Sequence, residues 1–423
     1  MRVAHILRKY DPAQWGGTET AIERLTAGFA GQGVDSVVYA PRLEQSSSVG
    51  AVLADPLVAV GCAVRRFRAF VSVWGISKER KRQMVAVGGN VMSFELMRAL
   101  WREPGVDVIH SHALGRLGAT GHVVARARHV PFVLSVHGGA YDLPVAVRAG
   151  LSRSAAGGWD WGKPFGWMLR ARHLFDEADA ILTVNEREAA LIRERHPDRR
   201  VVVQPHGVPA ASFARDQRAA ARKAFPELCG RPVLLVVGRI DAVKNQEWLI
   251  AQTADLVRRH PGVLVVFVGA CMNPEYGDTL RTRVRREGLD AKVCWAGNLP
   301  PGDPRLIGLL QEARAVVLPS VSETFGIVIL EAWAAGTPVI ATRTSGAKAL
   351  VEEGVNGWLF GLDASAEFHA AVDALLEDPA GGVARGAAGR AKVRANYDTA
   401  LLAGRVKRLY GELIEQKTHR HSA

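Results

Sequence analysis

The stretch PSVSETFGIVILEAWAAGTPV, residues 319–339, decides the fold of this chain. It follows a short apolar run at 315–318 that predicts a strand, and its serine-rich start predicts a loop. From Gly326 onward apolar residues recur at helical spacing, and Gly336 ends this helix before a second strand at 339–341. The succession of strand, loop, helix and strand is typical of a parallel sheet, whose ligands bind at the carboxyl ends of the strands.

Two glutamates in this stretch are candidate ligand contacts. Glu323 lies in the loop at the ligand edge of the predicted sheet. Glu331 lies inside the apolar helix, where a carboxylate is costly unless it meets hydroxyl groups or a cation. The pair therefore indicates a ligand that carries several hydroxyl groups.

The segment SETFGIVILEAWAAGTPVIAT resembles the E-x(7)-E segment of retaining glycosyltransferases of family 4, which have the GT-B fold. Glu323 and Glu331 have the spacing of that motif. Further positions that match the family pattern are Phe325, Gly326, Ala332, Ala335, Gly336 and Pro338. The resemblance covers nearly the whole chain but is specific mainly in 236–244 and 319–341. It implies an α/β protein in which two Rossmann-like, doubly wound domains face each other across a cleft.

Length and element order agree with two domains. A chain of 423 residues exceeds one ordinary core, and domains of roughly 200 residues are expected. We expect an acceptor-side domain at 1–207 and a donor domain at 208–399. The resemblance implies that the last helix, beyond about residue 400, packs back on the first domain.

Short apolar strands alternate with helices in both halves, which predicts parallel pairing. The expected strands are 3–7, 36–40, 106–110, 132–136, 180–184, 201–203, 233–237, 264–268 and 293–295. The expected helices include 18–30, 245–259 and 399–414, and the tail QKTHRHSA at 416–423 is expected to fray.

A candidate phosphate site follows the strand at 233–237. In VVGRIDAVKNQEWLI, Arg239 and Lys244 lie five positions apart across a turn that opens a helix. Two cations and a helix N-terminus can converge there on one phosphate-bearing group. The segment resembles the family's G-R-x-x-x-x-K motif, in which the cations hold the donor diphosphate; Asn245 replaces the glycine that usually follows the lysine.

A glycine turn joins the first strand to the first helix. In WGGTE, Gly16 and Gly17 allow backbone amides to approach an anion, and Thr18 can cap the helix before Glu19. The turn matches the family's first-domain loop, which implies that Gly16 and Gly17 contact the donor and that Glu19 lies on the acceptor side. It is neither a dinucleotide-binding G-x-G-x-x-G nor a P-loop, so hydride transfer and P-loop chemistry lose support.

Three histidines follow strands in the first half. His110 and His112 in DVIHSH have a spacing that metal ligands can have, but the sequence places no third ligand beside them and we expect no metal site. The resemblance implies that they lie on the acceptor side. It also implies that His137 in SVHGG lies over the donor sugar and stabilises an oxocarbenium-like transition state. His206 stands where the family commonly has asparagine.

The resemblance implies a division of labour in the donor domain. Glu331 would hold the donor ribose and Glu323 the sugar hydroxyls, while Phe325 and the amides of Gly326 and Ile327 complete the donor site. The leaving phosphate would accept the acceptor proton on the same face, so that configuration is retained. A nucleotide-diphosphate sugar would be the substrate, and no cofactor is expected.

Three alternatives stay open. An epimerase on the same fold would alter nucleotide sugar without an acceptor, and a phosphorylase would need phosphate as cosubstrate. A non-catalytic nucleotide-binding or membrane-adaptor protein would bind donor without turnover. The two glutamates and the two cations favour an enzyme.

The segment TSGAKAL at 344–350 matches the family's G-G-x-P-E-x-V pattern imperfectly. Lys348 and Ala349 replace the usual proline and glutamate. Gly346 and Ala347 are expected to offer backbone amides to phosphate.

Composition limits the classes of partner. A net charge of +12 permits an anionic partner, but no nucleic-acid-binding motif occurs. Residues 60–84 mix basic and aromatic side chains, which is typical either of an anionic membrane surface or of a solvated helix pair. The acceptor would be a glycan, a lipid-linked sugar or a small molecule.

The start of the chain and its cysteines complete the expectations. The chain moves from Met1 directly into a strand and contains no long apolar run, so we expect a cytoplasmic protein, peripheral on the membrane if 60–84 binds it. The scattered cysteines Cys62, Cys229, Cys271 and Cys294 are expected to be buried free thiols.

Overall fold

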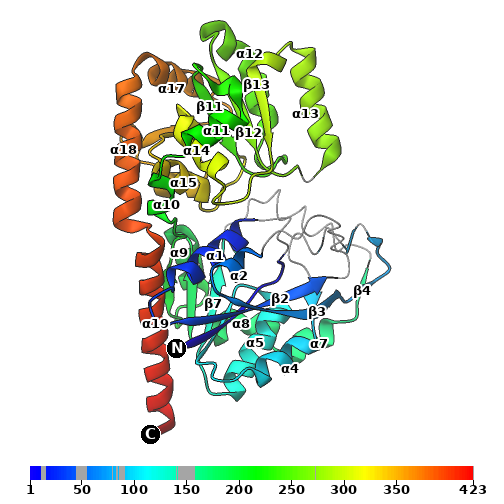
Figure 1. Ribbon diagram of the computed structural model, residues 1–423. Coiled ribbons are helices and arrows are strands. Elements are labelled where there is room, and N and C mark those ends of the chain that lie inside the picture. Colours follow the sequence, from blue (N-terminus) through cyan, green and yellow to red (C-terminus); the bar gives the residue numbers. More distant parts are fainter. Residues whose placement is uncertain are drawn as a thin grey trace. The chain divides into compact units, whose positions relative to one another are not determined.

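The structure is a computed structural model that describes residues 1–10, 16–43, 55–78, 80–81, 84, 91–139, 141, 158–271 and 273–422. The chain divides into two compact units (Figure 1). Unit 1 comprises Met1–Pro205 and Ala400–Ala423, and unit 2 comprises His206–Thr399. Each unit is described below by itself.

Unit 1 is built on an eight-stranded sheet with the order β10-β9-β7-β6-β1-β2-β3-β5. All neighbours pair in parallel except β3 and β5. The strands are β1 (Arg2–Ile6), β2 (Asp35–Leu43), β3 (Ala63–Val71), β5 (Val91–Met92), β6 (Val108–Ser111), β7 (Phe132–Val136), β9 (Ala180–Thr183) and β10 (Val201–Val203). A separate antiparallel pair joins β4 (Val73–Trp74) to β8 (Trp159–Asp160).

The helices of unit 1 connect these strands. They are α1 (Gly17–Gly28), α2 (Pro56–Ala59), α4 (Glu95–Arg102), α5 (Gly115–Ala127), α7 (Lys163–Met168), η1 (Ala171–His173), α8 (Leu174–Glu177), α9 (Glu186–Arg195) and the long C-terminal α19 (Thr399–Ser422).

Unit 2 is built on a six-stranded parallel sheet with the order β13-β12-β11-β14-β15-β16. Its strands are β11 (Val233–Val237), β12 (Leu264–Val268), β13 (Val293–Gly297), β14 (Ala315–Leu318), β15 (Val339–Thr342) and β16 (Gly357–Phe360). Its helices are α10 (Ala210–Ala214), α11 (Arg218–Ala224), η2 (Pro226–Leu228), α12 (Gln246–Arg259), α13 (Pro274–Arg286), η3 (Asp290–Lys292), α14 (Pro304–Glu312), α15 (Ile327–Ala335), α16 (Ser345–Leu350), α17 (Ser365–Glu377) and α18 (Pro379–Asn396).

Both sheets reverse their direction of growth beside their first strand. In unit 2 the chain adds β12 and β13 on one side of β11 and then β14, β15 and β16 on the other. In unit 1 the reversal lies between β1 and β6. Loops diverge at such a switch point, and ligands of doubly wound sheets bind there, at the carboxyl ends of the strands. The fold therefore marks the loops after β11 and β14, and those after β1 and β6.

The C-terminal helix α19 completes the core of unit 1. Tyr410 and Val406 on this helix are buried with Val3 of β1 and Val133 of β7. Apolar side chains on one face of α19 thus cover a face of the sheet. The helix lies far from these strands in the sequence: Val133 of β7 and Val406 are 273 residues apart.

Three expectations from the sequence are wrong. A helix pair was one of the two expectations for the segment 60–84 and is wrong, because its first part is strand β3, in which Phe67 and Ala69 are buried and Arg65 and Arg68 are exposed. The contact of this segment with a membrane stays a prediction. The tail is not frayed in the described backbone, because α19 continues to Ser422. Cys62 and Cys294 are buried free thiols as expected, but Cys229 is exposed and Cys271 only half-buried.

The strands that the sequence predicted lie within three residues of their expected bounds, and β2 is longer than expected. The short strands β4, β5 and β8 and the edge strand β16 were not predicted. Among the described residues, no helix is long and apolar enough to cross a membrane.

Candidate functional site

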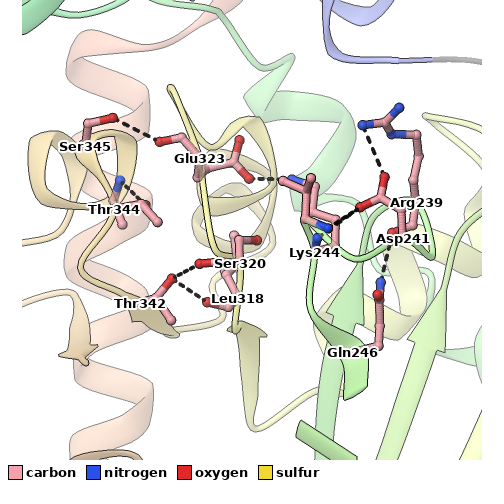
Figure 2. Close-up of polar contacts among 12 residues, drawn as sticks. Arg239, Asp241, Lys244, Gln246, Leu318, Ser320, Glu323, Thr342, Thr344 and Ser345 are labelled. Atoms are coloured by element: carbon pink, nitrogen blue, oxygen red, sulfur yellow. Dashed lines mark hydrogen bonds and ion pairs between the residues drawn. The ribbon is translucent and has the colours of Figure 1, made fainter. Parts of the chain in front are cut away.

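The loops after β11 and β14 are joined by three contacts, of which Figure 2 shows the one between Lys244 and Glu323. The Lys244 ammonium donates to Oε2 of Glu323, and the two side chains form an ion pair. The amide of Val321 donates to the carbonyl of Val243 at 2.8 Å, and Nδ2 of Asn245 donates to the carbonyl of Pro319 at 3.2 Å. The structure thus brings Lys244 and Glu323 together, although they lie far apart in the sequence.

Asp241, which sequence reasoning missed, shapes the cationic loop. Its Oδ1 accepts from the amides of Val243 and Lys244, both at 3.0 Å. Its Oδ2 lies 3.2 Å from Nη2 of Arg239, whose side chain is half exposed. An aspartate that accepts from the amides two and three residues ahead is typical of a turn, and this signal was present in the sequence.

The backbone conformation of Asn245 explains why asparagine can replace the glycine of the family motif. Its backbone is left-handed, with φ 56° and ψ 42°, directly before α12. Glycine adopts this conformation readily, and asparagine is among the few other residues that tolerate it. The replacement of glycine by asparagine therefore preserves the turn, and the side chain adds the contact to the second loop.

The E-x(7)-E segment runs from the loop after β14, which carries Glu323, into α15, which carries Glu331. Gly326 caps the helix with φ 89°, a conformation that favours glycine, and Phe325 before it is buried. Like the first amides of any helix, that of Ile327 has no acceptor within its own helix. Glu331 lies one turn along the helix and is 5% exposed. His206 packs its ring edge-on against Phe325 at 5.0 Å.

The first turn of α16 supports the loop that carries Glu323. The amide of Gly346 donates to the carbonyl of Glu323 at 2.8 Å, and a Cβ on Gly346 would lie 2.6 Å from the nitrogen of Phe325. The amide of Ala347 donates to Oγ1 of Thr344. These amides already have acceptors, so the expectation that Gly346 and Ala347 offer them to phosphate is wrong. Gly346 holds the loop, and the amide of Ala347 is bound by the N-cap of its own helix.

In unit 1 the side chain of Glu19 lies against the glycine turn that follows β1. Gly16, not Thr18, is the N-cap of α1, and the helix begins at Gly17. A Cβ on Gly16 would lie 2.8 Å from Oε2 of Glu19, so the side chain folds back on the turn. Burial raises the pKa of the Glu19 carboxyl. The preceding Trp15 lies outside the described residues.

The three predicted histidines meet at the ends of β6 and β7, together with a fourth. His5 on β1 lies beside His110 in the strand register. Nδ1 of His5 lies 3.1 Å from Nε2 of His112, and Nδ1 of His112 lies 2.9 Å from Nε2 of His137. The sequence did not single out His5, because a lone histidine within an apolar strand carries no motif.

His110 lies in the interior. It is fully buried, with Nδ1 2.5 Å from the hydroxyl of Tyr410 and Nε2 2.7 Å from Oγ of Ser135. A residue enclosed in this way supports the site from behind, which corrects the expectation that His110 is an acceptor-side contact. Burial lowers its pKa well below the ordinary value.

His137 is partly exposed and stays neutral. Loss of hydration lowers its pKa to about 4, and the nearby Arg8 cation acts in the same direction. Arg8, also missed by sequence reasoning, is close enough to Glu19 for their charges to interact. A neutral imidazole can stand beside a developing positive charge without repelling it.

Known protein families match both halves of the chain. The family described as Glycosyltransferase Family 4 matches residues 15–212, and the one described as Glycosyl transferases group 1 matches residues 217–392. A D-inositol 3-phosphate glycosyltransferase of Frankia alni is 30% identical over 393 residues, which cover 89% of this chain and 90% of that protein. The chain belongs to glycosyltransferase family 4.

Two further proteins are similar to this family 4 member. A D-inositol 3-phosphate glycosyltransferase of Nocardia farcinica is 31% identical over 67% of this chain, and the match spans only 62% of that relative's length. The crystal structure of HepE of Anabaena in complex with UDP-glucose has a TM-score of 0.72 and 17% identity, and covers 97% of this chain and 100% of that one. This likeness confirms the GT-B fold.

Proposed function

We propose that this family 4 protein is a retaining glycosyltransferase that moves a sugar from a nucleotide-diphosphate donor to an acceptor hydroxyl. One observation carries the proposal: Lys244 and Glu323 are paired between the two loops at the switch point of unit 2. A cation there can bind a diphosphate, and a carboxylate beside it can bind sugar hydroxyls.

The other residues of the site complete the donor contacts. Arg239 is half exposed next to Asp241 and is available to the diphosphate, and the first amides of α15 favour negative charge at the same edge. Glu331 is assigned to the donor ribose. His137 is assigned to the donor sugar in unit 1, with Gly16 and Gly17 beside the donor phosphate and Glu19 with His112 on the acceptor side.

Relatives suggest the first substrates to test. HepE was crystallised with UDP-glucose, and the curated relatives are named for D-inositol 3-phosphate. We propose a UDP-hexose as donor and a hydroxyl of a small phosphorylated molecule, a glycan or a lipid-linked sugar as acceptor. No cofactor or metal is assigned to the reaction.

A donor panel tests this proposal. UDP-, GDP- and ADP-sugars are scored by thermal shift, because a ligand at about 100 times its Kd adds about 2.7 kcal/mol of stability. Release of nucleoside diphosphate is then measured with and without acceptor. Acceptor-dependent release supports a transferase. Altered nucleotide sugar without acceptor would show an epimerase, a requirement for phosphate would show a phosphorylase, and binding without turnover would show a non-catalytic protein.

We also propose that unit 1 contacts an anionic membrane surface. Three tryptophans from β4, β8 and α7 are well exposed: Trp74 at 62%, Trp159 at 65% and Trp167 at 86%. The rings of Trp74 and Trp159 lie 5.5 Å apart across the β4–β8 pair. Tryptophan prefers the interface between lipid and water, and exposed aromatic clusters are uncommon on surfaces that meet only water.

Strand β3 links this aromatic surface to a basic cavity. Phe70 at its end stacks on Trp161 at 5.6 Å. Near its start, Arg65 and Arg66 line a cavity of about 650 Å³ to which Arg2, Arg42 and Arg102 also contribute. Glu103 pairs with Arg2 and Arg65 and is the sole acidic residue of the described lining, so the lining has a formal charge of 5 − 1 = +4.

Vesicle flotation at low salt tests the membrane contact. We expect binding to vesicles with anionic lipid and none to neutral vesicles. Replacing Arg65 and Arg102 by glutamine should weaken binding about thirtyfold, since each cation near such a surface contributes about 1 kcal/mol. Trp167→Ser should also weaken it, whereas Val383→Ser, at a 66% exposed apolar site in unit 2, should not. The wild-type protein failing to float with anionic vesicles would refute the proposal.

A further inference from the structure

A fully buried glutamate, Glu188, lies next to the loop that begins at His137. It belongs to the first turn of α9, the helix that follows β9, and is 0% exposed. Strand β9 pairs with β7, with Thr183 beside Val136, so α9 begins close to the point where β7 ends. A buried acidic side chain is costly unless hydrogen-bond donors surround it, and Glu188 has no part in the proposed donor contacts.

The carboxylate of Glu188 binds two backbone amides of that loop. Its Oε2 accepts from the amide of Gly139 and its Oε1 from the amide of Tyr141, both at 3.0 Å. Each oxygen therefore has a backbone donor, which offsets the cost of burying the carboxylate. In return, the carboxylate fixes two points of the loop backbone.

Glu188 is itself held in place by the start of its helix. Asn185 is the N-cap of α9, and its Oδ1 accepts from the amide of Glu188 at 2.8 Å. The carbonyl of Asn185 accepts from Oγ1 of Thr183 at 3.1 Å. These contacts tie the first turn of α9 to the end of β9. The carboxylate therefore comes from a capped helix turn that is anchored on the sheet.

The far end of α9 contacts the same loop. Its C-cap residue, His196, has Nε2 3.0 Å from the hydroxyl of Tyr141 and Nδ1 2.5 Å from Oδ1 of Asp176. The guanidinium of Arg195 lies over the ring of Tyr141, 4.6 Å from its centroid. The start of α9 thus binds the backbone of the loop, and the end of α9 binds its tyrosine.

The loop needs this support because two glycines follow His137. Gly138 has φ 106° and Gly139 has φ 82°, conformations that favour glycine. Glycine loses more backbone freedom on folding than any other residue, so this turn has little stiffness of its own. On the other side, His137 directly follows Val136, the last residue of β7. The direction of the His137 side chain therefore depends on the strand before it and on the amides that Glu188 binds after it.

We infer that Glu188 is a positioning residue, which fixes His137 by binding the loop that follows it. In this role Glu188 acts through the loop backbone and not on the substrates. Its effect on turnover rests on the proposed function, in which His137 contacts the donor sugar. Misplacement of a reacting group by about 1 Å can lower a rate about a hundredfold, so a loosened loop has a measurable consequence.

Amide hydrogen exchange tests the loop contacts without an assay of activity. Glu188→Gln keeps the shape of the side chain, but it offers one acceptor oxygen and turns an NH2 group toward the other backbone amide. We expect the amide of Gly139 or of Tyr141 to exchange at least about tenfold faster in this variant. Glu186→Gln, at a 70% exposed position of the same helix, is the control and should leave both rates unchanged.

Unchanged exchange at both amides in folded Glu188→Gln would overturn the inference. Should this variant fail to fold, Glu188→Asp takes its place, because it keeps the carboxylate and shortens the side chain by one methylene group. The shorter side chain cannot reach both amides, so the same increase in exchange is expected.

A double-mutant cycle with His137 separates positioning from stability. We expect Glu188→Gln to lower kcat about tenfold with the donor KM little changed, because the donor still binds but meets a misplaced imidazole. In a His137→Ala background the same change should cost less than about twofold, since the group that Glu188 positions is gone. A purely structural role would lower turnover equally in the two backgrounds, and that result would overturn the inference.

The inference and the proposed function fail in different ways. Wild-type turnover in folded His137→Ala would refute the proposed role of His137, and with it any effect of Glu188 on turnover. A loss of turnover in His137→Ala with none in Glu188→Gln would overturn the inference alone.

Discussion

Lys244 and Glu323 form the contact on which the candidate donor site depends. Lys244 is the side chain that places a full positive charge between the two switch-point loops. In the proposed reaction that charge stabilises the leaving diphosphate, and removal of one such preorganised group costs about 3 to 4 kcal/mol in the transition state. The contribution of Lys244 should therefore be visible in turnover.

Our first prediction is that Lys244→Ala lowers turnover about a hundredfold or more. Arg239→Ala should have an effect of the same kind. Lys223→Ala, which removes the same charge from an exposed position on α11 in unit 2, serves as the control and should leave turnover unchanged. Nucleoside diphosphate release at saturating donor measures the effect. A folded Lys244→Ala protein with wild-type turnover would contradict the assignment.

Residues next to strand ends were predictable, and residues that act through side-chain contacts were not. Arg239, Lys244, Glu323 and Glu331 lie in the predicted loops and helix because each follows a strand in the local sequence. His5 was missed because its partner His112 follows another strand, β6, and no local pattern reveals this contact.

Among the elements, the start of α12 shows how a motif tolerates replacement. Asn245 takes a left-handed backbone that costs most residues about 1 to 2 kcal/mol. We predict that Asn245→Ala is less stable than Asn245→Gly by about 1 kcal/mol. Both variants lose the side-chain contact to Pro319, so their difference isolates the backbone cost. Urea unfolding measures it, and equal midpoints would show that the left-handed conformation is not retained.

Strand β3 shows why the element prediction failed at 60–84. The alternation of buried Phe67 and Ala69 with Arg66 and Arg68 has the period of a strand with one buried face. The density of basic and aromatic residues favoured a surface helix, whereas the period of two indicates the strand that is found. By contrast, β11, β12 and β14 are uniformly apolar and all but Val237 of their residues are buried, and their bounds were predicted to the residue.

At the scale of the whole molecule, the buried histidines make stability depend on pH. Burial or loss of hydration lowers the pKa values of His5, His110 and His137 in the folded protein, while in the unfolded chain they are near 6.5. Above about pH 6.5 neither state binds these protons. Below it the unfolded state binds more, so stability is lost as the pH falls from about 6.5 toward the lowered values.

We predict that the free energy of unfolding falls by up to about 1.4 kcal/mol per pH unit for each of the three histidines below pH 6.5. Urea unfolding at pH 7.5, 6.5 and 5.5 measures the decline. His5→Gln removes one of the titrating groups and should reduce the slope. A free energy of unfolding that stays constant down to pH 5.5 would show that these histidines titrate normally in the folded protein.

The C-terminal helix has a consequence for how the protein is made. Tyr410 of α19 contacts His110 across 300 positions of sequence and fills the core beneath β1 and β7. A ribosome releases the chain from its N-terminus, and domains generally fold as they emerge. Here the unit that emerges first lacks α19 until residues 400–422 have also emerged. Unit 2 can close on the ribosome as an uninterrupted segment, whereas unit 1 must wait with a face of its sheet uncovered, and is the part of the nascent chain most in need of a chaperone.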